Sequence, residues 1–314
     1  MDKERAYDRD LEKYRDRVIA QAKLALDEDI GDGDITTKAV VKNQVEDAII
    51  ITKANGVLCG LLEAKSIFEE GGLEFNSEKM EGDILKKGDT VAKVRGNVQE
   101  LLKRERIALN YLQILSGIAT ATNRIVRKYP GKVAGLRKTH PGLGYSEKRA
   151  IKVGGGFTHR LGLYDGMLIK DNHLAAITKE IFKNGPINED KKVEAIREAL
   201  QRAKKYKVDK QLTACFIEIE VESLKQAIAA AKFYREEGML DIILLDNMSA
   251  KIAAECVKGI RREAGQKVLI ESSGGITLKN IGSYCEAGVD IISTSKITLS
   301  AEPLDMSMKI VGYK

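Results

Sequence analysis

The sequence contains no tryptophan, and aromatic residues make up only 5% of its 314 residues. It also lacks the RNP, helix-turn-helix and zinc-finger patterns that accompany nucleic-acid binding. Bases are held on single strands largely by stacking on aromatic rings, so this scarcity argues against a nucleic-acid partner. A small anionic substrate accounts better for the modest net charge of +6.

Cysteines are few and scattered, at Cys59, Cys215, Cys256 and Cys285. Their spacing fits neither a zinc site nor a disulfide framework, and it is typical of reduced thiols in a cytosol. No apolar run is long enough to span a bilayer, and the N-terminus is too charged for a signal peptide. We therefore expect a cytoplasmic protein without a membrane partner.

The first third of the chain predicts a small α/β domain that begins with an amphipathic helix over residues 11–27. The Gly/Asp/Thr-rich segment 27–37 is interpreted as a turn with a helix cap rather than a calcium loop, because it lacks the closing glutamate. Further elements are expected as strands at 48–53 and 56–62, a hairpin within 81–96, and a long helix over 100–129.

From Val133 onward, strand-like runs alternate with helical patterns. The expected strands are 133–136, 166–169, 216–219, 242–245, 268–271 and 291–294. Such alternation predicts a parallel sheet, either closed as a barrel or doubly wound.

A polar group follows every one of these strands, which favours the barrel. Barrels gather their chemistry around the carboxyl rim, whereas a doubly wound sheet concentrates it at one switch point. The rim positions in chain order are Arg137 and Lys138, Lys170 and Asp171, Glu220, Asp246 and Asn247, Ser272 and Ser273, and Thr294 and Ser295.

Cations and carboxylates lie in different parts of this predicted rim. Arg137 and Arg160 suit bidentate binding of carboxylates or phosphates, while Lys138 and Lys170 act as point charges. The segment 136–174 also holds all three histidines.

Among these histidines, His159 beside Arg160 is the candidate for contact with a ligand. We interpret His140 as structural, and His173 as a residue that caps or orients Lys170 and Asp171.

The remaining rim groups suit a substrate that has hydroxyls or a metal at the end away from the cations. Glu220 and Asp246 suit ribose hydroxyls, Mg²⁺ or a developing positive charge. The segment 271–276, ESSGGI, ends a strand with small residues whose N–H groups can close on a phosphate.

The chain resembles the quinolinate phosphoribosyltransferase family. The matching motifs are EDIGDGDITT (28–37), LSGIATAT (115–122), RKTHPGL (137–143), GGGFTHRLGLYDGMLIKDNH (154–173), IEVES (219–223), ILLDNMS (243–249), ESSGGITLKNI (271–281) and LDMSMKI (304–310). The resemblance implies an α/β protein with an N-terminal α/β sandwich domain over 1–117, joined by the tail 299–314, and an incomplete, seven-stranded α/β barrel over 118–298.

It also implies an enzyme of NAD biosynthesis that transfers phosphoribosyl from phosphoribosyl pyrophosphate to quinolinate with decarboxylation. Arg137, His159, Arg160 and Lys170 would surround the acid, with Arg106 from the partner of a homodimer or multiple of dimers. Lys138 would meet the pyrophosphate, Glu220 and Asp246 the ribose and Mg²⁺, and Ser272, Ser273, Gly274, Gly275 and Ser295 the phosphate end. Catalytic roles would fall to Lys138, Lys170, Glu220 and Asp246.

Several positions depart from the family pattern, namely Leu136, Gly144, Thr158, Ser295 and Leu299. A pocket that loses a polar partner changes specificity sharply, so a paralogous enzyme acting on another pyridine or azole acid is the alternative. A Schiff-base enzyme using Lys138 or Lys170 and a non-catalytic phosphoribosyl-ligand binding protein are further alternatives.

Overall fold

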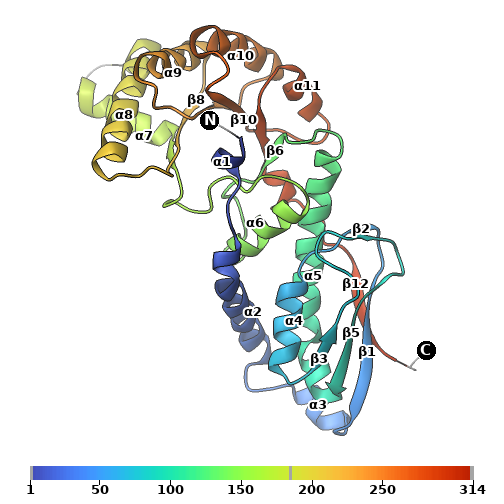
Figure 1. Ribbon diagram of the computed structural model, residues 1–314. Coiled ribbons are helices and arrows are strands. Elements are labelled where there is room, and N and C mark those ends of the chain that lie inside the picture. The colour runs from blue at the N-terminus through green and yellow to red at the C-terminus, as the bar shows by residue number, and fades with distance from the viewer. Residues whose placement is uncertain (1–2, 184–185, 312–314) are drawn as a thin grey trace. The chain divides into compact units, whose positions relative to one another are not determined.

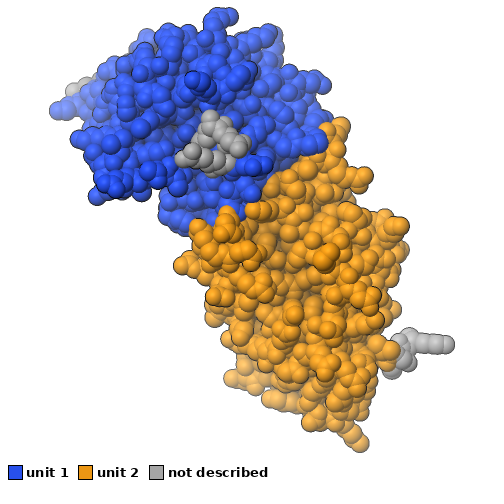
Figure 2. Space-filling model, viewed as in Figure 1, with its two compact units in different colours: residues 1–9, 129–137, 157–296 blue, residues 10–128, 138–156, 297–314 orange. Residues whose placement is uncertain are grey.

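The computed structural model describes residues 3–183 and 186–311, which pack into two compact units (Figures 1 and 2). Unit 1 comprises Met1–Arg9, Tyr129–Arg137 and Phe157–Lys296, and unit 2 comprises Asp10–Lys128, Lys138–Gly156 and Ile297–Lys314. These units are divided differently from the expected domains, 1–117 with 299–314 and 118–298. Residues 3–9 belong to unit 1 with its sheet, and residues 138–156 belong to unit 2.

Unit 1 is built on a parallel sheet with the strand order β6-β11-β10-β9-β8-β7. The strands are β6 (Val133–Ala134), β7 (Met167–Ile169), β8 (Ile217–Val221), β9 (Ile242–Asp246), β10 (Leu269–Ser273) and β11 (Ile291–Ser293). All six strands expected from the sequence are confirmed. The described residues supply a further single bridge, between Ala134 and Phe157, in place of a seventh full strand.

Helices connect these strands as the alternating pattern predicts (Figure 1). They are α7 (Asp171–Phe182), α8 (Glu189–Asp209), α9 (Leu224–Glu237), α10 (Ala250–Ala264) and α11 (Ile281–Glu286). Ser223 and Ser249 cap α9 and α10 by accepting hydrogen bonds from Gln226 and Ile252 N–H. Such caps satisfy donors that the first helical turn leaves unpaired, and they fix where each helix leaves its strand.

The N-terminal helix α1 (Lys3–Tyr7) closes the amino end of this sheet. Its residues Ala6 and Tyr7 are fully buried and share one hydrophobic cluster with residues at the start of the strands. The strand residues of this cluster are Ala134, Phe216, Ile242, Leu269 and Ile291. Burying a large aromatic side chain there stabilises unit 1 by roughly 1.5–3 kcal/mol.

Unit 2 contains an antiparallel sheet with the order β12-β1-β5-β3. Its strands are β1 (Val45–Thr52), β3 (Glu74–Asn76), β5 (Thr90–Asn97) and β12 (Met306–Ile310), and β2 (Gly56–Val57) pairs separately with β4 (Ile84–Leu85). The C-terminal strand β12 pairs with β1, so the tail returns to the first sheet as the resemblance implies.

The helices of unit 2 are α2 (Arg15–Ile30), α3 (Ile35–Val40), α4 (Leu61–Glu70), α5 (Val98–Val126) and α6 (Gly144–Val153), with a short turn η1 (Glu12–Tyr14). The apolar stripe expected in the first helix is buried at Val18, Ala22 and Leu26. Asp34 caps α3 by accepting a hydrogen bond from Thr37 N–H at 2.9 Å, which confirms the turn-and-cap interpretation.

Two local predictions were wrong. Only Gly56–Val57 of the expected strand 56–62 is extended, and α4 already begins at Leu61. The segment 81–96 contains the expected turn but no hairpin, because β4 pairs with β2 while β5 pairs with β1 and β3. Turn chemistry is local, whereas the choice of a strand partner is decided by which faces become buried.

None of the helices within the described ranges is long and apolar enough to cross a membrane.

Candidate active site

Three of the expected cations line one cavity of about 590 Å³ in unit 1. Arg137 follows β6, Lys170 follows β7, and Arg160 comes from the loop between Phe157 and Gly166. The parallel sheet brings these segments together because the carboxyl ends of its strands share one edge. The cavity also has an apolar wall that includes Met167, Ile177 and other residues of β7, α7 and α8.

Arg160 is the most enclosed of these cations, with 6% of its surface exposed. Its guanidinium donates a hydrogen bond to the carbonyl of Gly166 at 3.1 Å. Burial lowers the pKa of Arg160, Glu218 opposes that shift, and the nearby charge of Arg137 adds to it. An anion bound between the two guanidinium groups would relieve this repulsion.

Carboxylates adjoin the cationic cavity at Lys170. Its Nζ lies 3.6 Å from Glu220 Oε2, and Asp246 ends the neighbouring strand β9. Burial raises the pKa of Glu220 to about 7; Lys170 opposes this rise, whereas Asp246 adds to it. A pair of carboxylates that repel each other in this way is suited to a divalent cation or a developing positive charge.

The Ser-Ser-Gly-Gly segment ends β10 in a tight turn. A Cβ on Gly274 would stand 2.2 Å from Asn247 Oδ1 and 2.8 Å from the Asn247 nitrogen, so only glycine fits there. Gly275 also has a positive φ, of +64°, but it faces open space. Ser272 and Ser273 are buried within β10. The turn therefore presents backbone rather than side chains, as an anion-binding loop requires.

His159 departs from its expected role as a ligand contact. Its side chain is 2% exposed, and Nε2 lies 3.1 Å from Glu218 and 3.4 Å from Glu271. Nδ1 lies 2.6 Å from the backbone nitrogen of Arg160. Arg160, but not its neighbour His159, is among the described residues that line the cavity.

His159 is therefore part of a buried charge cluster inside unit 1. Burial alone would lower the pKa of its imidazole, but the carboxylates of Glu218 and Glu271 outweigh burial and raise the pKa to about 9. Ser293 donates a hydrogen bond to Glu271 within the same cluster. A protonated His159 thus compensates the buried carboxylates of Glu218 and Glu271.

The other two histidines have the structural roles expected of them. His140 Nδ1 lies 2.5 Å from the buried Glu147. His173 Nδ1 accepts a hydrogen bond from Lys170 N–H at 2.9 Å, which caps α7 beside the cavity.

Lys138 and Arg106 belong to unit 2. Lys138 is exposed, and its carbonyl accepts a hydrogen bond from Thr298 at 2.7 Å. Arg106 is exposed on α5. In unit 1, Ser295 opens the short turn η2 (Ser295–Ile297) directly after β11, and the preceding Thr294 donates a hydrogen bond to Ile276.

Sequence reasoning missed Glu218 and Glu271, the carboxylates around His159. The signal was present in Ile217–Val221, where two glutamates alternate with apolar residues in an otherwise buried strand. A charge in a buried strand calls for a partner, and His159 is that partner. The contacts of Tyr7 and Arg9 with Thr158 and Asp165 had no comparable signal in the sequence.

Comparisons with known proteins show the family of this chain. Family models described as the N-terminal and C-terminal domains of quinolinate phosphoribosyl transferase match residues 34–116 and 118–309. The chain belongs to the quinolinate phosphoribosyltransferase family. It is accordingly an enzyme.

Relatives in this family match over nearly their full length. The probable nicotinate-nucleotide pyrophosphorylase [carboxylating] of Archaeoglobus fulgidus is 37% identical over 89% of this chain and 98% of the relative. A chloroplastic nicotinate-nucleotide pyrophosphorylase [carboxylating] of Arabidopsis thaliana is 33% identical over 93% of this chain and 82% of the relative. The solved nicotinate-nucleotide pyrophosphorylase of Francisella tularensis matches with a TM-score of 0.79 and 30% identity, covering 94% and 96% of the two chains.

Proposed function

We propose that this enzyme transfers the phosphoribosyl group of phosphoribosyl pyrophosphate to quinolinate, giving nicotinate mononucleotide, pyrophosphate and CO₂ in NAD biosynthesis. The observation that carries the proposal is the cavity shared by Arg137, Arg160 and Lys170, with Glu220 beside Lys170. A dicarboxylate needs several cations at one end of a site, and a ribosyl cation needs carboxylates at the other.

In the cavity, Arg137 and Arg160 bind the two carboxylates of the pyridine ring. Lys170 stands between the cations and Glu220, so it can hold the ring at the junction with the ribose. The apolar wall at Met167 and Ile177 suits the flat face of the ring. Positioning the ring nitrogen over the anomeric carbon converts a bimolecular encounter into an intramolecular one.

At the sugar end, the ring nitrogen displaces pyrophosphate from the anomeric carbon through an oxocarbenium-like state. Glu220 and Asp246 stabilise the developing positive charge. Their paired carboxylate oxygens also fit a hard divalent cation, so they are the residues that would hold Mg²⁺. When bound there, Mg²⁺ supplies charge neutralisation to the leaving pyrophosphate.

Lys138 is assigned to the departing pyrophosphate, and the Ser-Ser-Gly-Gly turn to the phosphate of the ribose. The carboxylate next to the ring nitrogen then leaves as CO₂. Its bonding electron pair stays on the ring carbon, where the positive charge of the ring nitrogen stabilises it until a proton from water is added. Arg137 and Arg160 stay with the remaining carboxylate and keep the product ring in place. We further propose a cytoplasmic homodimer, or a multiple of dimers, in which Arg106 of one subunit completes the partner's site.

The test is an incubation of the protein with Mg²⁺, phosphoribosyl pyrophosphate and, in turn, quinolinate, nicotinate and nicotinamide. Release of both pyrophosphate and CO₂ with quinolinate alone is the expected result. Pyrophosphate without CO₂ from another acid would instead favour the paralogous activity that Leu136, Gly144 and Ser295 left open. Binding of phosphoribosyl pyrophosphate with no turnover would point to a non-catalytic binding protein.

A further inference from the structure

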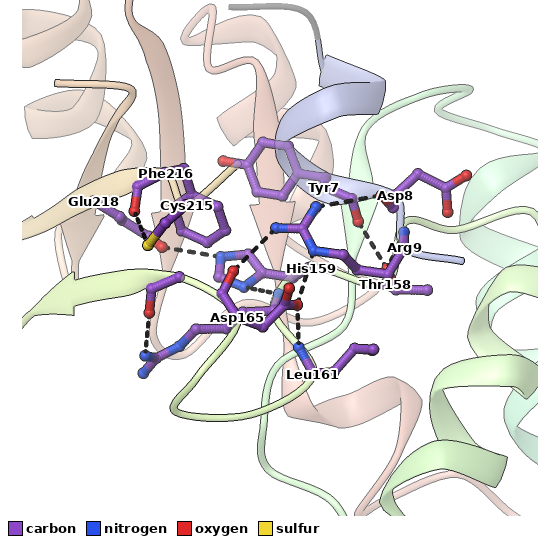
Figure 3. Close-up of polar contacts among 12 residues, drawn as sticks. Tyr7, Asp8, Arg9, Thr158, His159, Leu161, Asp165, Cys215, Phe216 and Glu218 are labelled. Atoms are coloured by element: carbon purple, nitrogen blue, oxygen red, sulfur yellow. Dashed lines mark hydrogen bonds and ion pairs between the residues drawn. The ribbon is translucent and has the colours of Figure 1, made fainter. Parts of the chain in front are cut away.

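The loop that carries Arg160 is fastened by the N-terminal segment of the chain (Figure 3). Residues 7–9 belong to unit 1 together with this loop, residues 158–166. They precede the regions matched by the family models, which begin at residue 34. Residues 7–9 thus lie outside the regions that the family models match.

The first end of the loop is held through Thr158. Its hydroxyl donates a hydrogen bond to the carbonyl of Tyr7 at 2.9 Å and accepts one from Arg9 N–H at 3.0 Å. The same Tyr7 carbonyl accepts a hydrogen bond from His159 N–H at 2.7 Å. Tyr7 itself is fully buried beneath the strands, so this anchor is fixed in place.

The second end of the loop is held through Asp165. Arg9 Nε lies 2.8 Å from Asp165 Oδ2, and the same oxygen accepts a hydrogen bond from Leu161 N–H at 2.9 Å. The Arg9 guanidinium also lies 5.4 Å from the centre of the Phe216 ring. The side chains of Arg9 and Asp165 are 13% and 19% exposed, so this ion pair is weakly screened by solvent.

Both anchors flank Arg160. It lies between Thr158 and Leu161 in the chain, and its guanidinium bonds the Gly166 carbonyl next to Asp165. His159, between Thr158 and Arg160, has a left-handed φ of 52°, a conformation that a non-glycine residue holds only when its surroundings enforce it. The contacts to residues 7–9 supply that enforcement.

We propose that Arg9 and Thr158 are positioning residues that hold the loop 158–166 so that Arg160 faces the acid-binding cavity. This inference rests on the proposed function of that cavity. At Thr158, one of the positions that depart from the family pattern, a single hydroxyl serves both the Tyr7 carbonyl and the Arg9 N–H. Neither Arg9 nor Thr158 needs to touch the substrate.

The test compares Arg9→Ala, Arg9→Lys and Thr158→Val with the unaltered enzyme in steady-state kinetics. A small displacement of a cation that positions the substrate lowers kcat/KM about tenfold to a hundredfold. We expect Arg9→Ala and Thr158→Val to raise the KM for quinolinate about tenfold, with the KM for phosphoribosyl pyrophosphate unchanged. Arg9→Lys keeps the positive charge but not the planar guanidinium group, so its KM for quinolinate should lie between those of the unaltered enzyme and Arg9→Ala.

A double-mutant cycle with Asp165→Ala identifies the route of the effect. Residues that act through one another give non-additive changes, so adding Asp165→Ala to Arg9→Ala should raise the KM little further. Arg202→Ala is the matched control, because Arg202 forms ion pairs with Glu180 and Glu198 on the surface of the same unit. It should leave both KM values unchanged.

The outcomes distinguish a failure of the proposed function from a failure of the positioning role of Arg9 and Thr158. If the unaltered enzyme shows no quinolinate-dependent release of CO₂, the proposed function fails. If it is active and Arg9→Ala binds quinolinate as before, or both KM values rise equally, the positioning role is overturned. Circular dichroism and thermal unfolding of each variant show whether it folds. If Arg9→Ala does not fold, Arg9→Lys and Thr158→Val decide the question by the same ratio of KM values.

Discussion

At the scale of single residues, Glu220 is the group whose ionisation matters most for the proposed chemistry. Burial and the neighbouring Asp246 hold its pKa at about 7, even though Lys170 lies 3.6 Å away. Its neutral form can neither bind Mg²⁺ nor stabilise a ribosyl cation. In the proposed reaction, ionisation of Glu220 would therefore separate an inactive from an active form near neutral pH.

We predict that kcat/KM rises with pH through an apparent pKa near 7, because the carboxylate is the working form of Glu220. Rate measurements between pH 5.5 and 8.5 at low Mg²⁺ check this. Higher Mg²⁺ should move the rise to lower pH, since the cation favours the charged form. Glu220→Gln should give a much slower enzyme without this rise. An unchanged rise in that variant would assign the titration to another group.

The same residue scale shows what the sequence could and could not predict. Arg137 and Lys170 were identified from their positions after strands, because strand ends of a parallel sheet meet at one rim. Arg160 was identified from the cation-rich loop that it shares with His159. The surroundings of His159 were not predicted, since its partners Glu218 and Glu271 lie far away in the chain. Which side of the loop the imidazole faces is decided by packing that no local pattern encodes.

The protonation of His159 also affects the stability of unit 1. Its pKa is about 9 in the folded protein, against an ordinary value of 6.5. The folded state therefore holds this proton more tightly than the unfolded state does. The stabilisation is fully present below pH 6.5 and is lost as the pH rises towards and through 9.

We predict that the free energy of unfolding falls between pH 7 and pH 9, as measured by urea denaturation. The groups facing the imidazole are Glu218, Glu271 and Tyr7, and burial together with the two carboxylates keeps the Tyr7 pKa well above its usual range, so Tyr7 stays neutral over this interval. His159→Gln removes the titrating group and should flatten the decline. A decline of the same size in that variant would contradict the assignment.

At the scale of elements, the end of β10 is constrained by its neighbour β9. Ser273 pairs with Asp246 in register, and the Ser273 carbonyl accepts a hydrogen bond from Asn247 N–H at 2.9 Å. Gly274 must follow with a φ of +89° because Asn247 occupies the space where a side chain would stand. The Gly-Gly turn thus ties the expected phosphate site to the carboxylate-bearing end of β9.

We predict that Gly274→Ala costs about 1–3 kcal/mol of stability or displaces the turn. In the second case the KM for phosphoribosyl pyrophosphate should rise well above that for quinolinate. Gly275→Ala is the matched control, since it adds the same methyl group at a positive φ but into open space. Thermal unfolding and the two KM values distinguish the cases. Equal effects of the two substitutions would show that close approach to Asn247 is not the constraint.

The sequence predicted helices and strands better than it predicted the surroundings of single residues. The six strands of unit 1 were predicted because apolar runs of four or five residues between amphipathic helices are distinctive. The pairing of β4 and β5 with different partners was not, since hairpin-like turn residues say nothing about which face of each strand is buried. Likewise, the charged residues around Tyr7 gave no indication that α1 packs against the sheet of unit 1.

At the scale of the whole molecule, the proposed site draws on two subunits. Arg106 is exposed on α5 of unit 2, and it lies in the stretch whose arginine is assigned to the partner's site. Arg160 lies in unit 1 and serves its own subunit's cavity. In a two-fold dimer, each complete site then needs one Arg106 and one Arg160 from different chains.

We predict that Arg106→Ala and Arg160→Ala are each nearly inactive alone but recover activity when their subunits are mixed. Random reassociation makes about half of the dimers mixed, and each mixed dimer has one intact site, so about a quarter of the full activity should return. Differently tagged subunits, unfolded together, refolded and purified for both tags, allow the mixed dimer to be assayed directly. Mixed dimers of Arg137→Ala with Arg160→Ala are the control, because both arginines line the same subunit's cavity and every site then lacks one of them. Recovery in that control, or none in the Arg106 mixture, would place Arg106 outside a shared site.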